Sequence, residues 1–139
     1  MQMEIPRKVV IKSMTVTNRN PEEVFDFFGD VKKSMEVGEA AKSVTRQGDG
    51  WWTFDHVAAG RSKMKHTSAI RDAGVLDHVF VGGGLEWQVY VRIVPNQHGA
   101  TVAWMFMRPD GLDDEAFERQ LGGFDHEIAL WREALEQKK

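Results

Sequence analysis

The chain has 139 residues, a formal net charge of −3 and 42% hydrophobic residues, which is enough for one domain over residues 1–139. The absence of cysteine excludes disulfides and thiolate chemistry, and the negative charge without a Lys/Arg cluster argues against a nucleic-acid partner. Residues 1–8 lack the apolar stretch of a signal peptide and no long apolar run follows, so we expect a cytoplasmic protein with no membrane insertion.

The N-terminal part of the chain predicts one strand followed by two short helices. β-Branched residues in alternation favour a strand over 8–17. A helix is expected to begin next, because Asn20 can cap it, Pro21 suits its first position and Glu23 can close a capping box. The segment after Asp30 predicts a second short helix that ends near Gly38.

The middle of the chain predicts an antiparallel meander. Short turns, most of them containing glycine, separate strands expected near 40–46, 51–58, 61–70, 75–82, 85–94 and 100–108. Connections this short make neighbouring strands antiparallel. Together with the first strand they give a sheet of six to seven strands.

One long amphipathic helix is predicted after the sheet, with Asp113 as its cap. Gly122 and Gly123 lie inside it and indicate either a kink, a flexible point or a tolerated irregularity. Its apolar residues recur at intervals of three and four, so they share one face: Phe117, Leu121, Phe124, Ile128, Trp131 and Leu135. Burying that stripe is worth on the order of 10 kcal/mol before entropy, so the helix is expected to lie on the sheet.

Turn lengths predict which side chains face the concave side of the sheet. In the strand 85–94 the odd positions form the buried face, and pairing Pro95 with Ala100 puts Val91 opposite Trp104. On the outer face, the same register gathers three apolar residues that either form a homodimer patch or are scattered surface residues: Tyr90, Met105 and Met107.

The triple-glycine turn at 82–84 allows two registers. Pairing Val81 with Leu85 turns Asp77 inward, whereas a two-residue loop turns His78 inward. Carried back to the strand 61–70, the second register would bury two lysines, which costs several kcal/mol for each unpaired charge. We therefore prefer the first register.

The preferred register predicts a small polar group inside an apolar cavity. His66 and Asp77 are the candidate catalytic pair, because a carboxylate can fix one imidazole tautomer and leave the other nitrogen free for proton transfer. The alternative is a buried polar pair satisfied by backbone or water. No spacing resembles a zinc signature, so no metal and no cofactor are predicted. The candidate ligand-binding residues are Trp52, Phe54, His56, Met64, Ser68, Trp87, Val89, Val91, Trp104, Phe106, Phe124 and Ile128.

The chain resembles the helix-grip superfamily, which comprises the START, Bet v 1-like and polyketide cyclase/dehydrase lipid-transport proteins. The resemblance is carried by the order of elements and by the runs 21–28, 74–78 and 108–117, of which the last two are similar to a branch of small bacterial members mostly without assigned function. It implies an α+β helix-grip fold: a curved antiparallel sheet, two short helices after the first strand, and a long C-terminal helix over the concave face.

The predicted cavity and the resemblance are consistent with three functions. The first is binding of a small hydrophobic or aromatic metabolite between the sheet and the last helix. The second is an enzyme of the cyclase/dehydrase type in which His66 and Asp77 transfer protons. The third, implied by the resemblance, is an interaction module like the superfamily's chaperone co-factors, with a filled core in place of a cavity.

Overall fold

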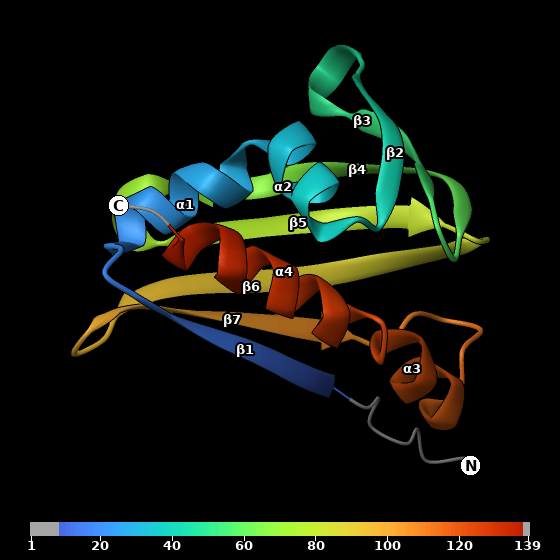
Figure 1. The fold of residues 1–139 in the computed structure, drawn as a ribbon. Coiled ribbons are helices and arrows are strands. Elements are labelled where there is room, and N and C mark those ends of the chain that lie inside the picture. The colour runs from blue at the N-terminus through green and yellow to red at the C-terminus, as the bar shows by residue number, and fades with distance from the viewer. Residues whose placement is uncertain (1–8, 138–139) are drawn as a thin grey trace.

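The computed structural model describes residues 9–137, so the first predicted residue of the N-terminal strand, Lys8, and the segment 1–8 lie outside the described residues. Within this range seven strands form one antiparallel sheet in the order β1-β7-β6-β5-β4-β3-β2 (Figure 1). The predicted meander is confirmed. The strands are β1 (Val9–Thr17), β2 (Ala41–Arg46), β3 (Trp52–His56), β4 (Gly60–Ile70), β5 (Val75–Gly82), β6 (Leu85–Pro95) and β7 (Gly99–Met107).

The helices begin where the capping residues predict. The side chain of Asn20 accepts a hydrogen bond from the amide of Glu23 at 2.8 Å, and the Glu23 carboxylate accepts one from the amide of Asn20 at 2.9 Å. Asp113 caps the third helix through the amide of Ala116 at 2.8 Å. The helices are α1 (Pro21–Gly29), α2 (Val31–Gly38), α3 (Asp114–Leu121) and α4 (Phe124–Glu136), and α4 crosses the concave side of the curved sheet (Figure 1). The fold is α+β, as expected.

The long last helix is interrupted at the glycine pair. The amide of Gly122 donates to the carbonyl of Arg119 and that of His126 to the carbonyl of Gly123, both at 3.2 Å, so the backbone tightens into three-residue hydrogen bonding there. Glycine's poor helix propensity explains why the break falls here. The predicted stripe still packs inward: Phe117, Leu121, Trp131 and Leu135 are buried, and Phe124 and Ile128 are partly buried.

The register at the triple-glycine turn was predicted wrongly. Gly82 pairs with Leu85, which leaves Gly83 and Gly84 as a two-residue loop with φ of 61° and 79°. Positive φ at both central residues is the geometry that two-residue hairpins require, and glycine supplies it without strain. His78 therefore faces the concave side, and Asp77 faces the outer side.

A β-bulge removes the charge burial that had argued against this register. Ile70 pairs with Val75 as expected, but the pairing shifts by one residue between His66 and Ser68, so His66 pairs with His78. The bulge keeps the two lysines outside. Their ammonium groups lie over the ring of Trp51, at 4.4 Å for Lys63 and 5.1 Å for Lys65.

The space between α4 and the sheet contains the larger of two apolar clusters. Trp131 of α4 stacks on Trp104 of β7 with ring centroids 5.7 Å apart, and its indole N–H donates to the carbonyl of Ser34 at 2.7 Å. A Cβ atom at Gly38 would lie 3.0 Å from the Trp131 ring, so α2 and α4 approach closely only because that residue is glycine. The indole of Trp131 thus connects α2, α4 and the sheet.

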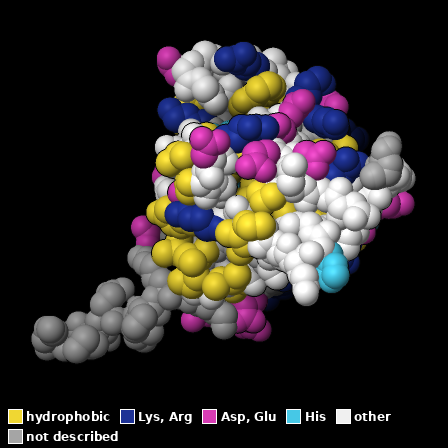
Figure 2. Space-filling view, turned by 90° about the vertical axis from the view of Figure 1, so that its left-hand side faces the viewer, with side chains coloured by type: hydrophobic (Ala, Val, Ile, Leu, Met, Phe, Trp, Pro, Cys, Tyr) yellow, Lys and Arg dark blue, Asp and Glu magenta, His cyan; other side chains and the backbone are white. Residues whose placement is uncertain are grey.

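The outer face of the sheet carries exposed apolar side chains, as the register of β6 and β7 predicts. Tyr90 pairs with Met105, and each is 39% exposed. Met107, also on β7, and Ile11 of the neighbouring strand β1 are exposed as well. Figure 2 shows hydrophobic side chains gathered on the lower left of the molecule, while lysines, arginines and acidic residues are interspersed above them.

Candidate ligand-binding cavity

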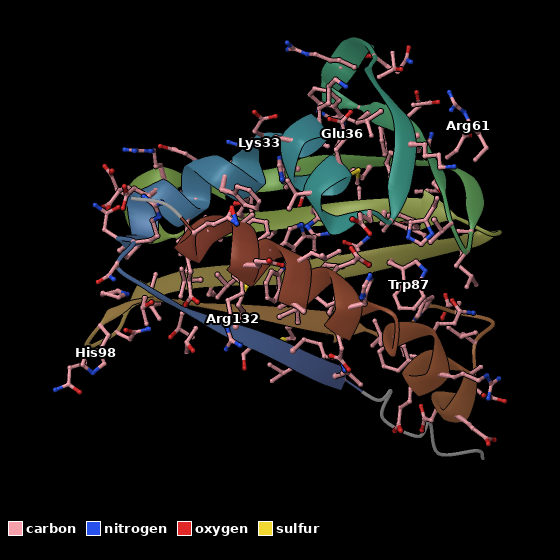
Figure 3. All side chains as sticks on the ribbon, in the orientation of Figure 1. Lys33, Glu36, Arg61, Trp87, His98 and Arg132 are labelled. Atoms are coloured by element: carbon pink, nitrogen blue, oxygen red, sulfur yellow. The ribbon has the colours of Figure 1, made fainter. Side chains whose placement is uncertain are left out.

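A cavity of about 710 Å³ lies between the concave face of the sheet and the helices α2, α3 and α4. Its walls are mostly apolar, and β6 and β7 supply Trp87, Val89, Val91, Trp104 and Phe106. The side chain of Trp87 extends from β6 toward α3 (Figure 3), and its ring centroid lies 5.7 Å from that of Phe117 in α3. A hollow of this size is within the range that holds drug-sized molecules in proteins.

The exposed residues of the cavity wall mark its opening. Val57 belongs to the turn between β3 and β4, Gly83 to the turn between β5 and β6, and Gln120 to the end of α3. The two turns are neighbours, because a Cβ atom at Gly83 would lie 3.6 Å from that of Ala59. The cavity therefore opens where these turns meet the junction of α3 and α4, close to the glycine pair.

Most of the predicted ligand-binding residues line this cavity. They are His56, Met64, Trp87, Val89, Val91, Trp104, Phe106 and Phe124. Phe54 and Trp52 do not line it, because they pack in a second apolar cluster around Val31 and Val44. Ile128 packs against the main cluster, and Ser68 lies beyond the bulge that ends the inward alternation of β4.

The predicted pair of His66 and Asp77 does not form. His66 lines the cavity, whereas the Asp77 carboxylate lies on the outer side and accepts hydrogen bonds from the amide of Val91 at 2.8 Å and from Arg92 at 2.7 Å. The two-residue turn at Gly83 causes the difference, since a shift of one residue exchanges the faces of β5. Asp77 therefore bridges β5 and β6 rather than serving the cavity.

We expect Asp77→Ala to lower the free energy of unfolding by about 1 to 3 kcal/mol, because it leaves the buried amide of Val91 without its acceptor. The matched control is Asp55→Ala, which removes an exposed pair with Arg61 and should cost less than about 1 kcal/mol. Urea denaturation measures both. A change in the pKa of His66 in the Asp77→Ala variant, measured by NMR titration, would show that the two side chains interact and would contradict this arrangement.

Two imidazoles face each other inside the cavity. His66 and His78 pair across β4 and β5, and their ring centroids are 6.2 Å apart at an interplanar angle of 84°. Burial lowers the pKa of His66. Burial, and secondarily the charge of His66, lowers the pKa of His78 to about 4, although Asp77 and the backbone of Leu76 oppose this. Both rings are therefore neutral near pH 7.

A third imidazole has a fixed tautomer. Nδ1 of His56 accepts hydrogen bonds from the amides of Ala58 and Ala59, both at 3.1 Å. That nitrogen carries no proton, so the ring hydrogen is on Nε2. Burial also lowers the pKa of His56. The cavity wall thus contains an imidazole whose Nε2–H is free to donate.

The helix side of the cavity contributes polar residues that the sequence did not indicate. Gln120, His126 and Glu127 line it around the junction of α3 and α4. The even positions of β5, Leu76 and Phe80, were also missed because the register of the triple-glycine turn was wrong. A two-residue loop at the glycines would have predicted that the even positions of β5 face the cavity. The three-residue spacing from Phe124 to Glu127 would have predicted that both side chains lie on the same side of the helix.

No group of three or more His, Cys, Asp or Glu side chains within residues 9–137 could hold a metal ion. Over the same residues, no helix is long and apolar enough to cross a membrane.

No protein-family model and no curated protein matches the chain in sequence. Solved structures do. An uncharacterised protein from Bacillus thuringiensis superposes with a TM-score of 0.76 at 11% identity, covering 92% of this chain and 98% of its own. Ara h 8.0201 gives 0.71 at 12% identity, covering 91% and 94%. DynU16, from the dynemicin biosynthetic locus, gives 0.72 at 15% identity, covering 95% of this chain and 48% of its own. The chain therefore has the helix-grip fold of Bet v 1-like proteins.

Proposed function

We propose that this protein binds a small hydrophobic or aromatic molecule in the cavity between the sheet and α4. The open volume of about 710 Å³ behind an aromatic wall carries the proposal. Fully packed interiors leave few voids larger than a water molecule, so a cavity of this size is typical of a ligand-binding site. Bet v 1-like and cyclase-like structural neighbours support ligand binding as the general activity.

Aromatic rings would provide the contacts for a flat ligand. Trp104, Phe106 and Phe124 line the cavity, and Phe124 meets both other rings edge to face at 5.2 Å and 4.9 Å. Such rings bury large apolar areas at little cost in conformational entropy. The neutral imidazoles on the opposite wall would orient a hydroxyl or carbonyl group of the ligand.

The other two functions have less support from the geometry. The cyclase/dehydrase hypothesis relied on proton transfer between His66 and Asp77, and these side chains lie on opposite faces of the sheet. The hypothesis of an interaction module required a filled core, whereas the described residues surround a cavity. Ligand binding is the function that both observations favour.

A cavity-filling substitution tests the proposal. Val89 lines the cavity and is 2% exposed, so Val89→Phe should weaken binding of the uncharged dye phenylnaphthylamine by about tenfold or more. The matched control is Val94→Phe on the same strand, where the side chain is 47% exposed and should leave binding unchanged. Dye fluorescence measures the dissociation constants. Equal binding by both variants, or no binding by the unmodified protein, would contradict the proposal.

A further inference from the structure

We propose that the cavity selects molecules that carry a positively charged amine on an apolar or aromatic body, and that the carboxylate of Glu127 binds the amine. The inference rests on the ligand-binding function proposed above and adds the chemical class of the ligand. It follows from the position of Glu127, the charges of the cavity wall and the rings around it.

Glu127 is a polar residue on a helix face that otherwise packs inward. It follows Phe124 by three positions and precedes Trp131 by four, so the three side chains share one side of α4. All three line the cavity. Glu127 is half-buried, and its carboxyl group has no hydrogen-bond or ion-pair partner among residues 9–137. A carboxyl group that is partly buried without a partner lowers stability, and a ligand can supply the partner.

The charge of the cavity wall favours a cation. The described residues that line the cavity include Glu39 and Glu127 but no lysine or arginine. Lys12 of β1 approaches α4, but its ammonium group binds Asp125 at 3.0 Å. A ligand with a carboxylate or phosphate would therefore enter without a positive group to pair with. A ligand ammonium would find the exposed carboxylate of Glu39 and the half-buried carboxylate of Glu127 on the cavity wall.

Aromatic rings beside Glu127 would stabilise the same cation. Phe124 and Trp131 lie on either side of Glu127 in the helix, and their ring centroids are 5.3 Å apart. Trp104 stacks against Trp131 from the sheet. The face of an aromatic ring attracts an ammonium group, most strongly where water is displaced. A carboxylate set among such rings is suited to an organic ammonium ion.

Binding of an amine should release a proton. Burial raises the pKa of Glu127 to about 8, so its carboxyl group is mostly protonated at pH 7 in the empty cavity. An ammonium ion beside it lowers that pKa, and the carboxyl group then loses its proton to solvent. The other titratable groups on the cavity wall are Glu39, His56, His66, His78 and His126. Of these, the three imidazoles on β3, β4 and β5 have lowered pKa values and stay neutral at pH 7.

Three probes with one apolar body test the inference: naphthylethylamine, naphthylethanol and naphthylacetate. Isothermal titration calorimetry at pH 7 should show the amine binding about tenfold more tightly than the alcohol, and the carboxylate binding most weakly. Repeating the amine titration in buffers of different ionisation enthalpy should show release of about one proton for each amine bound.

Glu127→Gln keeps the shape of the side chain and removes its charge. In this variant the amine and the alcohol should bind within about twofold of each other, and proton release should disappear. The matched control is Glu133→Gln, which removes a charge from the exposed side of the same helix and should change neither result. An alcohol that bound as tightly as the amine in the unmodified protein would overturn the inference and leave the proposed function standing. Failure of all three probes to bind would overturn both.

Discussion

Replacing Trp131 with alanine is expected to lower the free energy of unfolding by about 4 kcal/mol, the cost of removing a large buried aromatic side chain. The indole is 6% exposed and contacts Phe28, Trp104 and Phe124 with ring centroids between 5.1 and 5.7 Å. Its N–H also satisfies the buried carbonyl of Ser34. The substitution therefore removes one side chain that joins α2, α4 and the sheet, together with its hydrogen bond to the carbonyl of Ser34.

Urea denaturation of the variant measures this loss, and Trp51→Ala is its matched control. The Trp51 ring is only partly buried and contacts two lysine ammonium groups on the outer face, so its removal should cost about 1 kcal/mol or less. Near-UV circular dichroism should change strongly in the Trp131 variant, because the Trp104 and Trp131 rings are stacked at 25°. Equal losses in the two variants would mean that α4 is not held to the sheet by this ring.

The parts of the fold that sequence predicts well depend on local chemistry. Asn20 and Asp113 mark helix starts because their side chains accept hydrogen bonds from the amides three residues further on. The pairing of β6 with β7 follows from one four-residue turn, and it places Val91 opposite Trp104 as predicted. In both cases the determining contacts lie within a few residues of each other in the chain.

The register of β4 and β5 depends on features that residue types do not reveal. Three glycines in a row fit a loop of two or three residues equally well, and the choice reverses both faces of the strand. The bulge between His66 and Ser68 resolves the conflict with the two lysines, but no glycine or proline marks it. Asp77 was therefore assigned to the cavity, although it bridges two strands on the other side of the sheet.

Glu127 was missed for a different reason. Its position lies beside the apolar stripe of the last helix, where a charged residue normally faces solvent. The α3 and α4 segments instead bend at the glycine pair, and the edge of the stripe turns toward the hollow. A helical pattern identifies the centre of a buried face better than its borders.

The unpartnered carboxyl group of Glu127 is expected to lower the stability of the fold, as other features of the proposed ligand site are. A cavity and a buried ionisable group both weaken a fold, and both are expected where a site must accept a ligand. The glycine pair at the opening adds to this cost, since neither glycine lies in the left-handed region and alanine would favour the helix at both positions. These three features lie within a few residues of each other around the start of α4.

Glu127→Gln is expected to make the ligand-free protein more stable at high pH and to leave it unchanged at low pH. In the unfolded chain the carboxyl group titrates near its ordinary value of 4.5, whereas burial raises its pKa in the folded protein to about 8. Between these values the folded state binds a proton that the unfolded state has lost, so stability falls as the pH rises. Glutamine has no such proton. The difference between 4.5 and about 8 is worth about 5 kcal/mol by about pH 9, and solvent screening of this half-buried side chain lowers the expected gain over the unmodified protein to about 3 kcal/mol.

His78 gives the opposite slope in a pH range that overlaps that of Glu127. Its pKa falls from 6.5 to about 4 on folding, so the unfolded chain binds the extra proton between these values and stability rises with pH. In the unmodified protein the two opposite slopes should largely cancel between about pH 4.5 and 6.5, and urea denaturation should show a decline in stability from about pH 6.5 to 8. Glu127→Gln should remove this decline and reveal a rise in stability up to about pH 6.5, while Glu133→Gln should behave as the unmodified protein does. A decline that persisted in Glu127→Gln would mean that this carboxyl group is already charged and solvated in the folded protein.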